Sequence, residues 1–147
     1  MLENAEFSPL DLVPTRQFVE HRRVYVLNQD LVFTSEKYGV VTVPRGFKTD
    51  LASVPRIVTP LFPTDGKYLE ASVVHDYYYA FGIKTKKEAD RLFRDGMKVL
   101  GVSRWRRWTM YWMVRLFGRG QYGHANPRKY PGYIEQDLLD DKGQPKK

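Results

Sequence analysis

The chain has 147 residues, of which 42% are hydrophobic and 14% aromatic, so it is long enough and apolar enough to fold around a core. It contains no cysteine, which excludes disulfide scaffolds, thiolate zinc sites and cysteine nucleophiles. Its net charge of +7 favours acidic partners such as nucleic acid, anionic lipid or an acidic protein surface.

The sequence shows no segment that we expect to direct the chain to, or through, a membrane. The N-terminal stretch MLENAEFSPLDLVP is acidic and lacks an apolar core, so we expect no signal peptide. No apolar run reaches the roughly 18 residues that a transmembrane helix needs. We therefore expect a soluble protein that binds at most to a membrane surface.

The first half of the chain is predicted to form an extended arm followed by a small antiparallel β-meander. The arm covers residues 1–16, which contain two prolines, and the meander covers residues 17–46. Three runs rich in β-branched and aromatic residues predict its strands: residues 22–28, 30–35 and 38–44. The tripeptide Asn28-Gln29-Asp30 suits a turn between the first two strands.

The second half of the chain is predicted to be a loop, a helical segment and a tail. Residues 47–64 contain three prolines, so we expect an ordered loop there rather than a long helix. Residues 65–118 carry the apolar periodicity of helices, and residues 119–147 are expected to form a loop-rich tail. We therefore predict one α+β domain over residues 1–147, with a β-meander followed by a three-helix unit.

Local signals mark the ends of the predicted helices. The helices are expected over residues 65–80, 85–100 and 103–117. Gly82 and Gly101 suit the ends of the first two, and Thr85 with Glu88 forms a capping box at the start of the second. The first helix is expected to bury a single stripe: Tyr68, Ala71, His75 and Tyr78 or Tyr79.

Four polar residues form the candidate site of this sequence: Asp50, His75, Asp76 and Asp90. Adjacent helical residues point about 100° apart, so His75 and Asp76 must face different partners. We expect His75 to point at the second helix, where Asp90 accepts its Nδ1 hydrogen, and Asp76 to point at the loop that carries Asp50. The alternative is that this cluster only holds the helices and the loop together through satisfied hydrogen bonds.

The two halves of the cluster together would suit hydrolysis. An acid that orients a histidine fixes its tautomer and stabilises the imidazolium that forms when the ring accepts a proton. Two close carboxylates need a proton or a cation between them, and with backbone carbonyls they offer the oxygen ligands that calcium prefers. Zinc fits less well, because the cluster contains one histidine. The histidine would then activate water while the cation stabilises the oxyanion.

The order of these residues resembles the phospholipase A2 fold, most of all its bacterial members. There a His-Asp pair and a following tyrosine on one helix face an aspartate on the next, as His75-Asp76 and Asp90 are placed here, and residues 49–51 are similar to the calcium loop. The resemblance implies that His75 is the general base, that Asp90 is its partner and that the substrate is a lipid ester. The implied calcium ligands are Asp50, the Leu51 carbonyl and Asp76, and the following tyrosine is Tyr78 or Tyr79. Ser53 is a further supporting residue, which we expect to cap the local turn.

Three motifs also resemble a family of small phage and prophage proteins, domain-of-unknown-function family 1353. They are VPRGFKTDLASVP at residues 43–55, HDYYY at residues 75–79 and EADRLF at residues 88–93. The resemblance implies a phage or prophage origin, and a location in the host cytoplasm or in the virion, but no activity. Two functions therefore stay open. One is a calcium-dependent ester hydrolase, and the other is a phage structural or assembly protein whose His/Asp cluster is structural.

A basic, aromatic surface is predicted on the third helix. Arg104, Trp105, Arg107 and Trp108 could together contact phospholipid headgroups at a membrane surface. The preferred interpretation is that the tryptophans pack on the first two helices instead. Nucleic-acid binding ranks last, because no helix-turn-helix, zinc motif or glycine-rich phosphate loop accompanies the positive charge.

Overall fold

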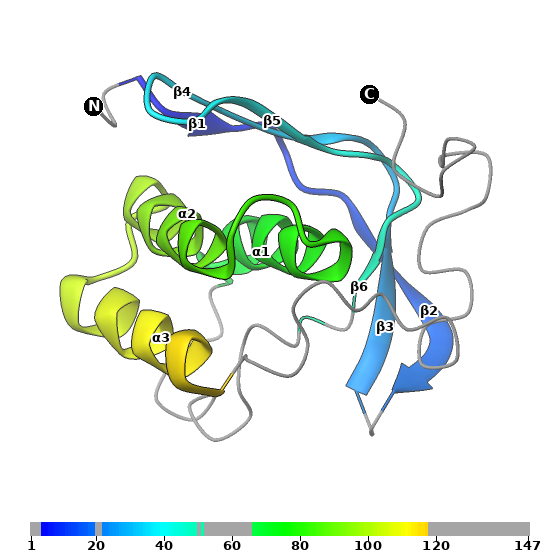
Figure 1. Ribbon diagram of the computed structural model, residues 1–147. Helices are drawn as coiled ribbons and strands as arrows, with labels where there is room; N and C mark the ends of the chain where they lie inside the picture. The colour runs from blue at the N-terminus through cyan, green and yellow to red at the C-terminus, as the bar shows by residue number, and fades with distance from the viewer. Residues whose placement is uncertain (1–3, 20–21, 50, 52–65, 118–147) are drawn as a thin grey trace.

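The computed structural model describes residues 4–19, 22–49, 51 and 66–117 of the chain. The strands in these residues are β1 Glu6–Phe7, β2 Leu12–Val19, β3 Arg22–Leu27, β4 Leu31–Ser35, β5 Gly39–Val43 and β6 Lys48–Thr49. The helices are α1 Leu69–Phe81, α2 Lys86–Val99 and α3 Arg104–Phe117. The strands form two antiparallel sheets, with the orders β1-β4-β5 and β2-β3-β6, and the helices follow them in the chain (Figure 1). The predicted α+β class is confirmed.

The strands differ from a simple meander in how they pair. The predicted β-rich runs are confirmed as β3, β4 and β5, but β3 and β4 belong to different sheets although they follow each other in the chain. Asn28 lies between them in a bend, where its backbone N–H donates to the Asp11 carbonyl at 2.9 Å. β2 and β6 pair with the two edges of β3, so β4 cannot pair with it and joins the other sheet.

The N-terminal residues are part of the sheets rather than a separate arm. β1 pairs with β4, placing Phe7 opposite Phe33, and their rings stack with centroids 4.4 Å apart. β2 pairs with β3 from Leu12 opposite Leu27 onward, with a register shift between Pro14 and Phe18. Residues 6–7 and 12–16 of the predicted arm thus lie in paired strands, because apolar side chains of this segment pack against the core.

The helix ends follow the predicted local signals. Gly82, with φ +60°, ends α1, and its N–H donates to the Tyr78 carbonyl. At the start of α2 the Thr85 hydroxyl accepts from the Glu88 N–H while the Glu88 side chain accepts from the Thr85 N–H, so the capping box is complete. Gly101 has φ +83°, a conformation that favours glycine, and it follows α2 as expected.

α1 is the central helix of the fold. It contacts β5 and β6 on one side and α2 on the other, and α3 packs on α2 (Figure 1). All residues from Ala71 to Ala80 are therefore buried, so the prediction of a single inward stripe on this helix is wrong. His75 and Asp76 can both be buried on such a helix, while facing different neighbours.

Candidate functional site

His75 on α1 and Asp90 on α2 are in direct contact. The Nε2 atom of His75 lies 2.7 Å from Oδ1 of Asp90, and the two side chains are 1% and 0% exposed. The predicted pairing of these residues is confirmed. The nitrogen is Nε2 and not the expected Nδ1, because the outer edge of the ring is the part that reaches across to α2.

Two aromatic rings hold the imidazole of His75 in place. The Tyr79 ring, one turn along α1, lies with its centroid 4.1 Å from that of His75. Phe93 of α2 stacks on His75 with a centroid distance of 4.7 Å. Tyr79 also donates its hydroxyl to Asp90 at 2.5 Å. Of the two tyrosines that the sequence left open, Tyr79 is thus the one that contacts the Asp90 carboxylate, while Tyr78 is buried in the core.

Asp90 is the centre of a hydrogen-bond network that joins the helices. Its Oδ1 contacts His75 and Tyr79 of α1. Its Oδ2 accepts from Lys86 Nζ at 2.9 Å and from Arg115 NH1 of α3 at 3.0 Å. Lys86 also donates to the carbonyls of Val114 and Arg115, at 3.0 and 3.3 Å. Sequence reasoning missed Lys86 and Arg115. The i,i+4 spacing of Lys86 and Asp90 was a signal for the first, but no local pattern places Arg115 beside Asp90.

The electrostatics of the pair favour a neutral imidazole beside an ionised carboxylate. Burial alone would raise the pKa of Asp90, but hydrogen bonds from His75, Tyr79 and Lys86 outweigh it and lower the pKa to about 2. Burial lowers the pKa of His75, and the nearby Lys86 charge acts in the same direction, against the attraction of Asp90. The buried histidine is therefore an unprotonated base near neutral pH, oriented by an anion.

Asp76 faces away from this network, toward the end of β6. Its Oδ2 accepts a hydrogen bond from the Thr49 hydroxyl at 2.5 Å, and Thr49 Oγ1 in turn accepts from the Leu51 N–H at 3.0 Å. Thr49 is fully buried, Asp76 is 7% exposed, and Leu51 has φ +59°. This relay places the backbone at residue 51 close to the carboxylate of Asp76, as expected for a loop that faces it.

The donor set expected for calcium is only partly within the described residues. Asp50 and Ser53 lie outside them, so the predicted Asp76–Asp50 pair and the position of Ser53 are not part of the description. Within the described part of the chain, no three His, Asp or Glu side chains come together in a way that could hold a metal ion. What the described residues offer is the Asp76 carboxylate, an oxygen donor of the kind that suits calcium, with the Leu51 N–H linked to it through the Thr49 hydroxyl.

The predicted surface residues lie on α3 and are accessible. Trp105 is 55% exposed, Trp112 is 53% exposed and Trp108 is 37% exposed. The preferred expectation that the tryptophans pack on the first two helices is therefore wrong for Trp105 and Trp112. α3 instead uses the opposite side of the helix for packing, where Met110 and Val114 are buried.

Comparison with known proteins gives the family of the chain. A family model described as "Protein of unknown function (DUF1353)" matches residues 25–114, which is more than half of the sequence. The chain belongs to the DUF1353 family. The DUF1353 match runs from β3 into α3, and it includes His75, Asp76 and Asp90 but ends one residue before Arg115.

Relatives of this DUF1353 chain are found in the bacterium Sinorhizobium fredii (strain NBRC 101917 / NGR234). The uncharacterized protein y4jT is 34% identical over 109 residues, which cover 71% of this chain and 32% of the relative. The uncharacterized protein y4iH is 34% identical over 82 residues, which cover 54% of this chain and 34% of the relative. The chain thus spans about a third of the length of the curated relatives it matches. No solved structure matches it.

None of the helices in the described residues combines the length and the apolar character that crossing a bilayer requires.

Proposed function

We propose that this DUF1353 protein is an ester hydrolase in which His75 acts as general base and Asp90 orients it. The observation that carries the proposal is the 2.7 Å contact between Nε2 of His75 and the Asp90 carboxylate, on two helices and beside the Tyr79 hydroxyl. A histidine held in one tautomer by an ionised acid is the arrangement that activates water in hydrolases. The order of these residues also resembles that of bacterial phospholipases A2.

The chemistry follows from the tautomer of His75. We propose that His75 donates its Nε2 hydrogen to the ionised Asp90 carboxylate, and that Nδ1 is the nitrogen that accepts a proton from water. The oxygen of that water attacks the ester carbonyl carbon, the bond to the alcohol oxygen breaks, and the proton on His75 passes to the leaving alcohol. Asp90 stabilises the imidazolium that exists between these steps, and its low pKa keeps it ionised throughout.

We propose calcium as the cofactor and a lipid ester as the substrate. Asp76, the Leu51 carbonyl and Asp50 are the groups that would hold the ion. The Thr49 hydroxyl, which donates to Asp76 and accepts from the Leu51 N–H, supports a position of residue 51 near Asp76. Calcium, when bound there, would stabilise the negative charge on the ester oxygen. A phage origin belongs to the same proposal and rests on the three sequence motifs.

Turnover of a phospholipid by the purified protein tests this function. His75→Asn should lower kcat by about 10²-fold or more, because the base is lost. Ser72→Ala is the matched control, since Ser72 is also buried on α1 and its hydroxyl donates to the Tyr68 carbonyl at 2.9 Å rather than to the His75–Asp90 pair. Asp76→Asn should raise the calcium concentration needed for half-maximal turnover. Full activity of His75→Asn would overturn the role of the base, and full activity of the wild type in EDTA would overturn calcium.

A second candidate function is supported by the burial of the same residues. His75 and Asp90 are 1% and 0% exposed, and Asp90 accepts hydrogen bonds from α1, α2 and α3, which is what a purely structural cluster requires. We propose on this ground the alternative of a phage structural or assembly protein without turnover. A wild-type protein that hydrolyses no phospholipid with calcium, magnesium or EDTA, yet unfolds at lower temperature as His75→Asn, would favour this alternative.

A further inference from the structure

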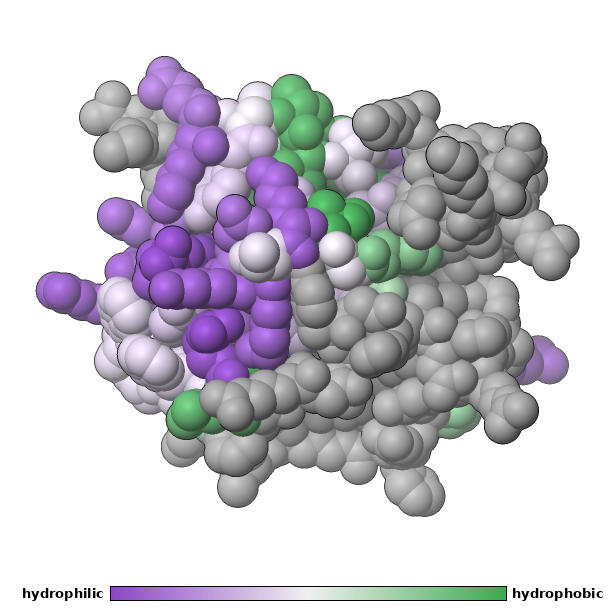
Figure 2. Space-filling view, viewed as in Figure 1, coloured by the Kyte–Doolittle hydropathy of each residue, from purple (hydrophilic) through white to green (hydrophobic). Residues whose placement is uncertain are grey.

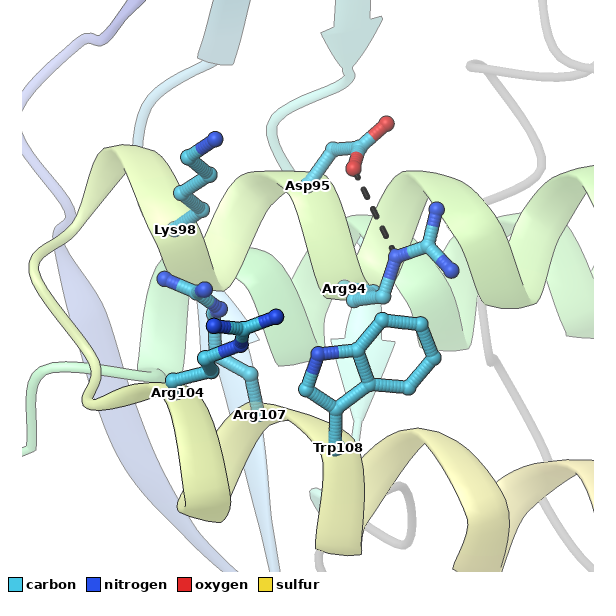
Figure 3. A pocket seen from close by; sticks show the side chains of 6 residues that line it. All are labelled: Arg94, Asp95, Lys98, Arg104, Arg107 and Trp108. Atoms are coloured by element: carbon cyan, nitrogen blue, oxygen red, sulfur yellow. Dashed lines mark ion pairs between the residues drawn. The ribbon is translucent and has the colours of Figure 1, made fainter.

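A second charged site lies on the solvent side of α2 and α3, away from His75. It is a cavity of about 430 Å³ lined by Arg94, Asp95, Lys98, Arg104, Arg107 and Trp108 (Figure 3). Four of these six side chains are cations and one is an acid. In Figure 2, strongly hydrophilic side chains gather over the part of the molecule where α2 and α3 lie in Figure 1.

The single acid of this pocket is already neutralised by groups other than the pocket arginines of α3. Asp95 Oδ2 accepts from Lys37 Nζ at 2.8 Å and also from the Tyr38 hydroxyl. Arg94 is 3.6 Å from Oδ1 of Asp95, and its guanidinium lies over the rings of Trp108 and Tyr111 at 4.8 and 4.9 Å. Positive charge is therefore in excess in this cavity.

The remaining cations are positioned to receive an anion. Arg104 and Arg107 lie side by side below α2 in Figure 3, and neither they nor Lys98 form an ion pair with an acid of the described residues. Arg104 is the first residue of α3, and the first turn of this helix contains no acid, so the positive end of the helix dipole adds to the field. Guanidinium groups converging from one helix onto a cavity are a usual way to bind phosphate oxygens.

Next to the pocket, α3 exposes an apolar stripe. Trp105 and Leu116 are 55% and 56% exposed, and Trp112 is 53% exposed. Their positions lie within about 40° of one another around the helix axis. A stripe of tryptophan and leucine flanked by arginines is the composition of helices that lie in the interface of an anionic membrane. A soluble phosphate compound has no apolar surface for this stripe to contact.

We propose that the pocket between α2 and α3 binds the headgroup phosphate of an anionic lipid surface, with the exposed side of α3 lying in the interface. Arg104, Arg107 and Lys98 contact the phosphate, and Trp105, Trp112 and Leu116 enter the acyl boundary. This goes beyond ester hydrolysis, because it concerns binding alone and would hold for either function proposed above.

Binding to vesicles of ether-linked lipids tests the proposal without interference from hydrolysis. Ether-linked phosphatidylglycerol has the anionic phosphate but no ester, and ether-linked phosphatidylcholine is the zwitterionic comparison. The three tryptophans of the chain all lie in α3, so their fluorescence reports on this helix alone. We expect co-sedimentation with phosphatidylglycerol vesicles together with a blue shift of the emission, and much weaker binding to phosphatidylcholine.

Variants then separate the pocket from general positive charge. The double variant Lys98→Gln and Arg104→Gln should bind phosphatidylglycerol vesicles roughly 25-fold more weakly, since each basic residue at an anionic surface contributes roughly fivefold. The control is Arg16→Gln with Arg45→Gln, which removes the same charge from exposed positions on the strand side of the fold. We expect a loss of less than about threefold there. An equal loss in the control would overturn the pocket as the site.

Other ligands provide the remaining outcomes. Binding of inorganic phosphate as tightly as vesicles, with no blue shift on vesicles, would assign the pocket to soluble phosphate compounds and overturn the lipid. Binding of a single-stranded oligonucleotide that depends on Lys98 and Arg104, without vesicle binding, would assign it to nucleic acid. Tryptophan emission that is already blue-shifted and shielded from acrylamide before vesicles are added would show that α3 is covered, and would also overturn the proposal.

Discussion

The two ends of the α2–α3 helix pair use the same residue types in opposite ways. At one end, Lys86 and Arg115 both donate to Asp90, which is fully buried. At the other end, Asp95 accepts from Lys37, and Lys98, Arg104 and Arg107 line the pocket without an ion pair to an acid of the described residues. At the first end the positive charges pair with a buried acid and stabilise the fold, whereas at the second end they face the pocket proposed to bind a ligand. The number of basic residues alone does not separate these uses; the position of the nearest acid does.

Removing the acid at each end should give the largest difference in the free energy of unfolding between the two ends. Asp90→Ala leaves Lys86, Arg115 and His75 without their shared partner in the interior, and we expect it to lower the free energy of unfolding by about 3–5 kcal/mol. Asp95→Ala leaves Lys37, which is 40% exposed in its side chain and can be solvated, so the loss should be about 1–2 kcal/mol. Urea unfolding of both variants measures the difference.

The contrast has an internal control. Asp90→Asn keeps an oxygen acceptor of the same shape and should lose less than Asp90→Ala, with the difference reporting the charge. Equal losses for Asp90→Ala and Asp95→Ala would mean that the network around Asp90 is no more important to the fold than the surface of the pocket.

Two lysines of α2 allow the same comparison with a cation. Lys86 donates to Asp90 and to two carbonyls of α3, while Lys98 is exposed at the rim of the pocket. Lys86→Met should cost about 1–3 kcal/mol, because buried acceptors lose their donor. Lys98→Met should cost at most about 0.5 kcal/mol, mainly through the lost attraction to the C-terminal end of the helix. Thermal unfolding of the two variants under the same conditions measures both losses. A similar loss of stability for both would contradict the proposed difference between the two ends.

The helices were predictable because their ends depend on neighbouring residues. Thr85 and Glu88 cap α2 through contacts three positions apart, and Gly82 ends α1 through its own backbone conformation. The sheets were predicted less well, since pairing depends on distant residues. β2 contains Pro14, a residue that argues against a strand in the sequence. β2 is an edge strand, however, and tolerates a proline beside its register shift. Without β2, the separation of β3 from β4 could not be seen.

The contacts of the candidate site also differ in whether they could be predicted from the sequence. His75 and Asp90 could be paired from the sequence, because two successive helices joined by a short turn must pack antiparallel and bring their facing polar residues together. Arg115 could not be found, since its contact with Asp90 depends on how α3 crosses α2. The exposure of Trp105 and Trp112 was misjudged, because a spacing of apolar residues does not tell which side of a helix has a neighbour.

The two ends should also differ in how they respond to pH, by a smaller amount. The pKa of folded His75 is lowered from its ordinary value near 6.5, so protonation favours the unfolded chain. The stability that this group contributes is therefore complete above about pH 6.5 and declines as the pH falls below it, by at most about 1.4 kcal/mol per pH unit for one proton. Asp90 affects stability only at lower pH. Because its folded pKa is about 2, its contribution to the free energy of unfolding is complete until the pH falls below about 4.

Unfolding between pH 8 and pH 5 therefore tests the buried end of the helix pair, where His75 lies. Urea unfolding across that range should show falling stability in the wild type and in the double variant Lys98→Gln and Arg104→Gln, but a flatter profile in His75→Asn. Parallel profiles for the wild type and His75→Asn would mean that another group sets the pH response. Vesicle binding measured over the same range should stay constant while the stability changes, because the charges that bind the phosphate are not those that hold the helices together.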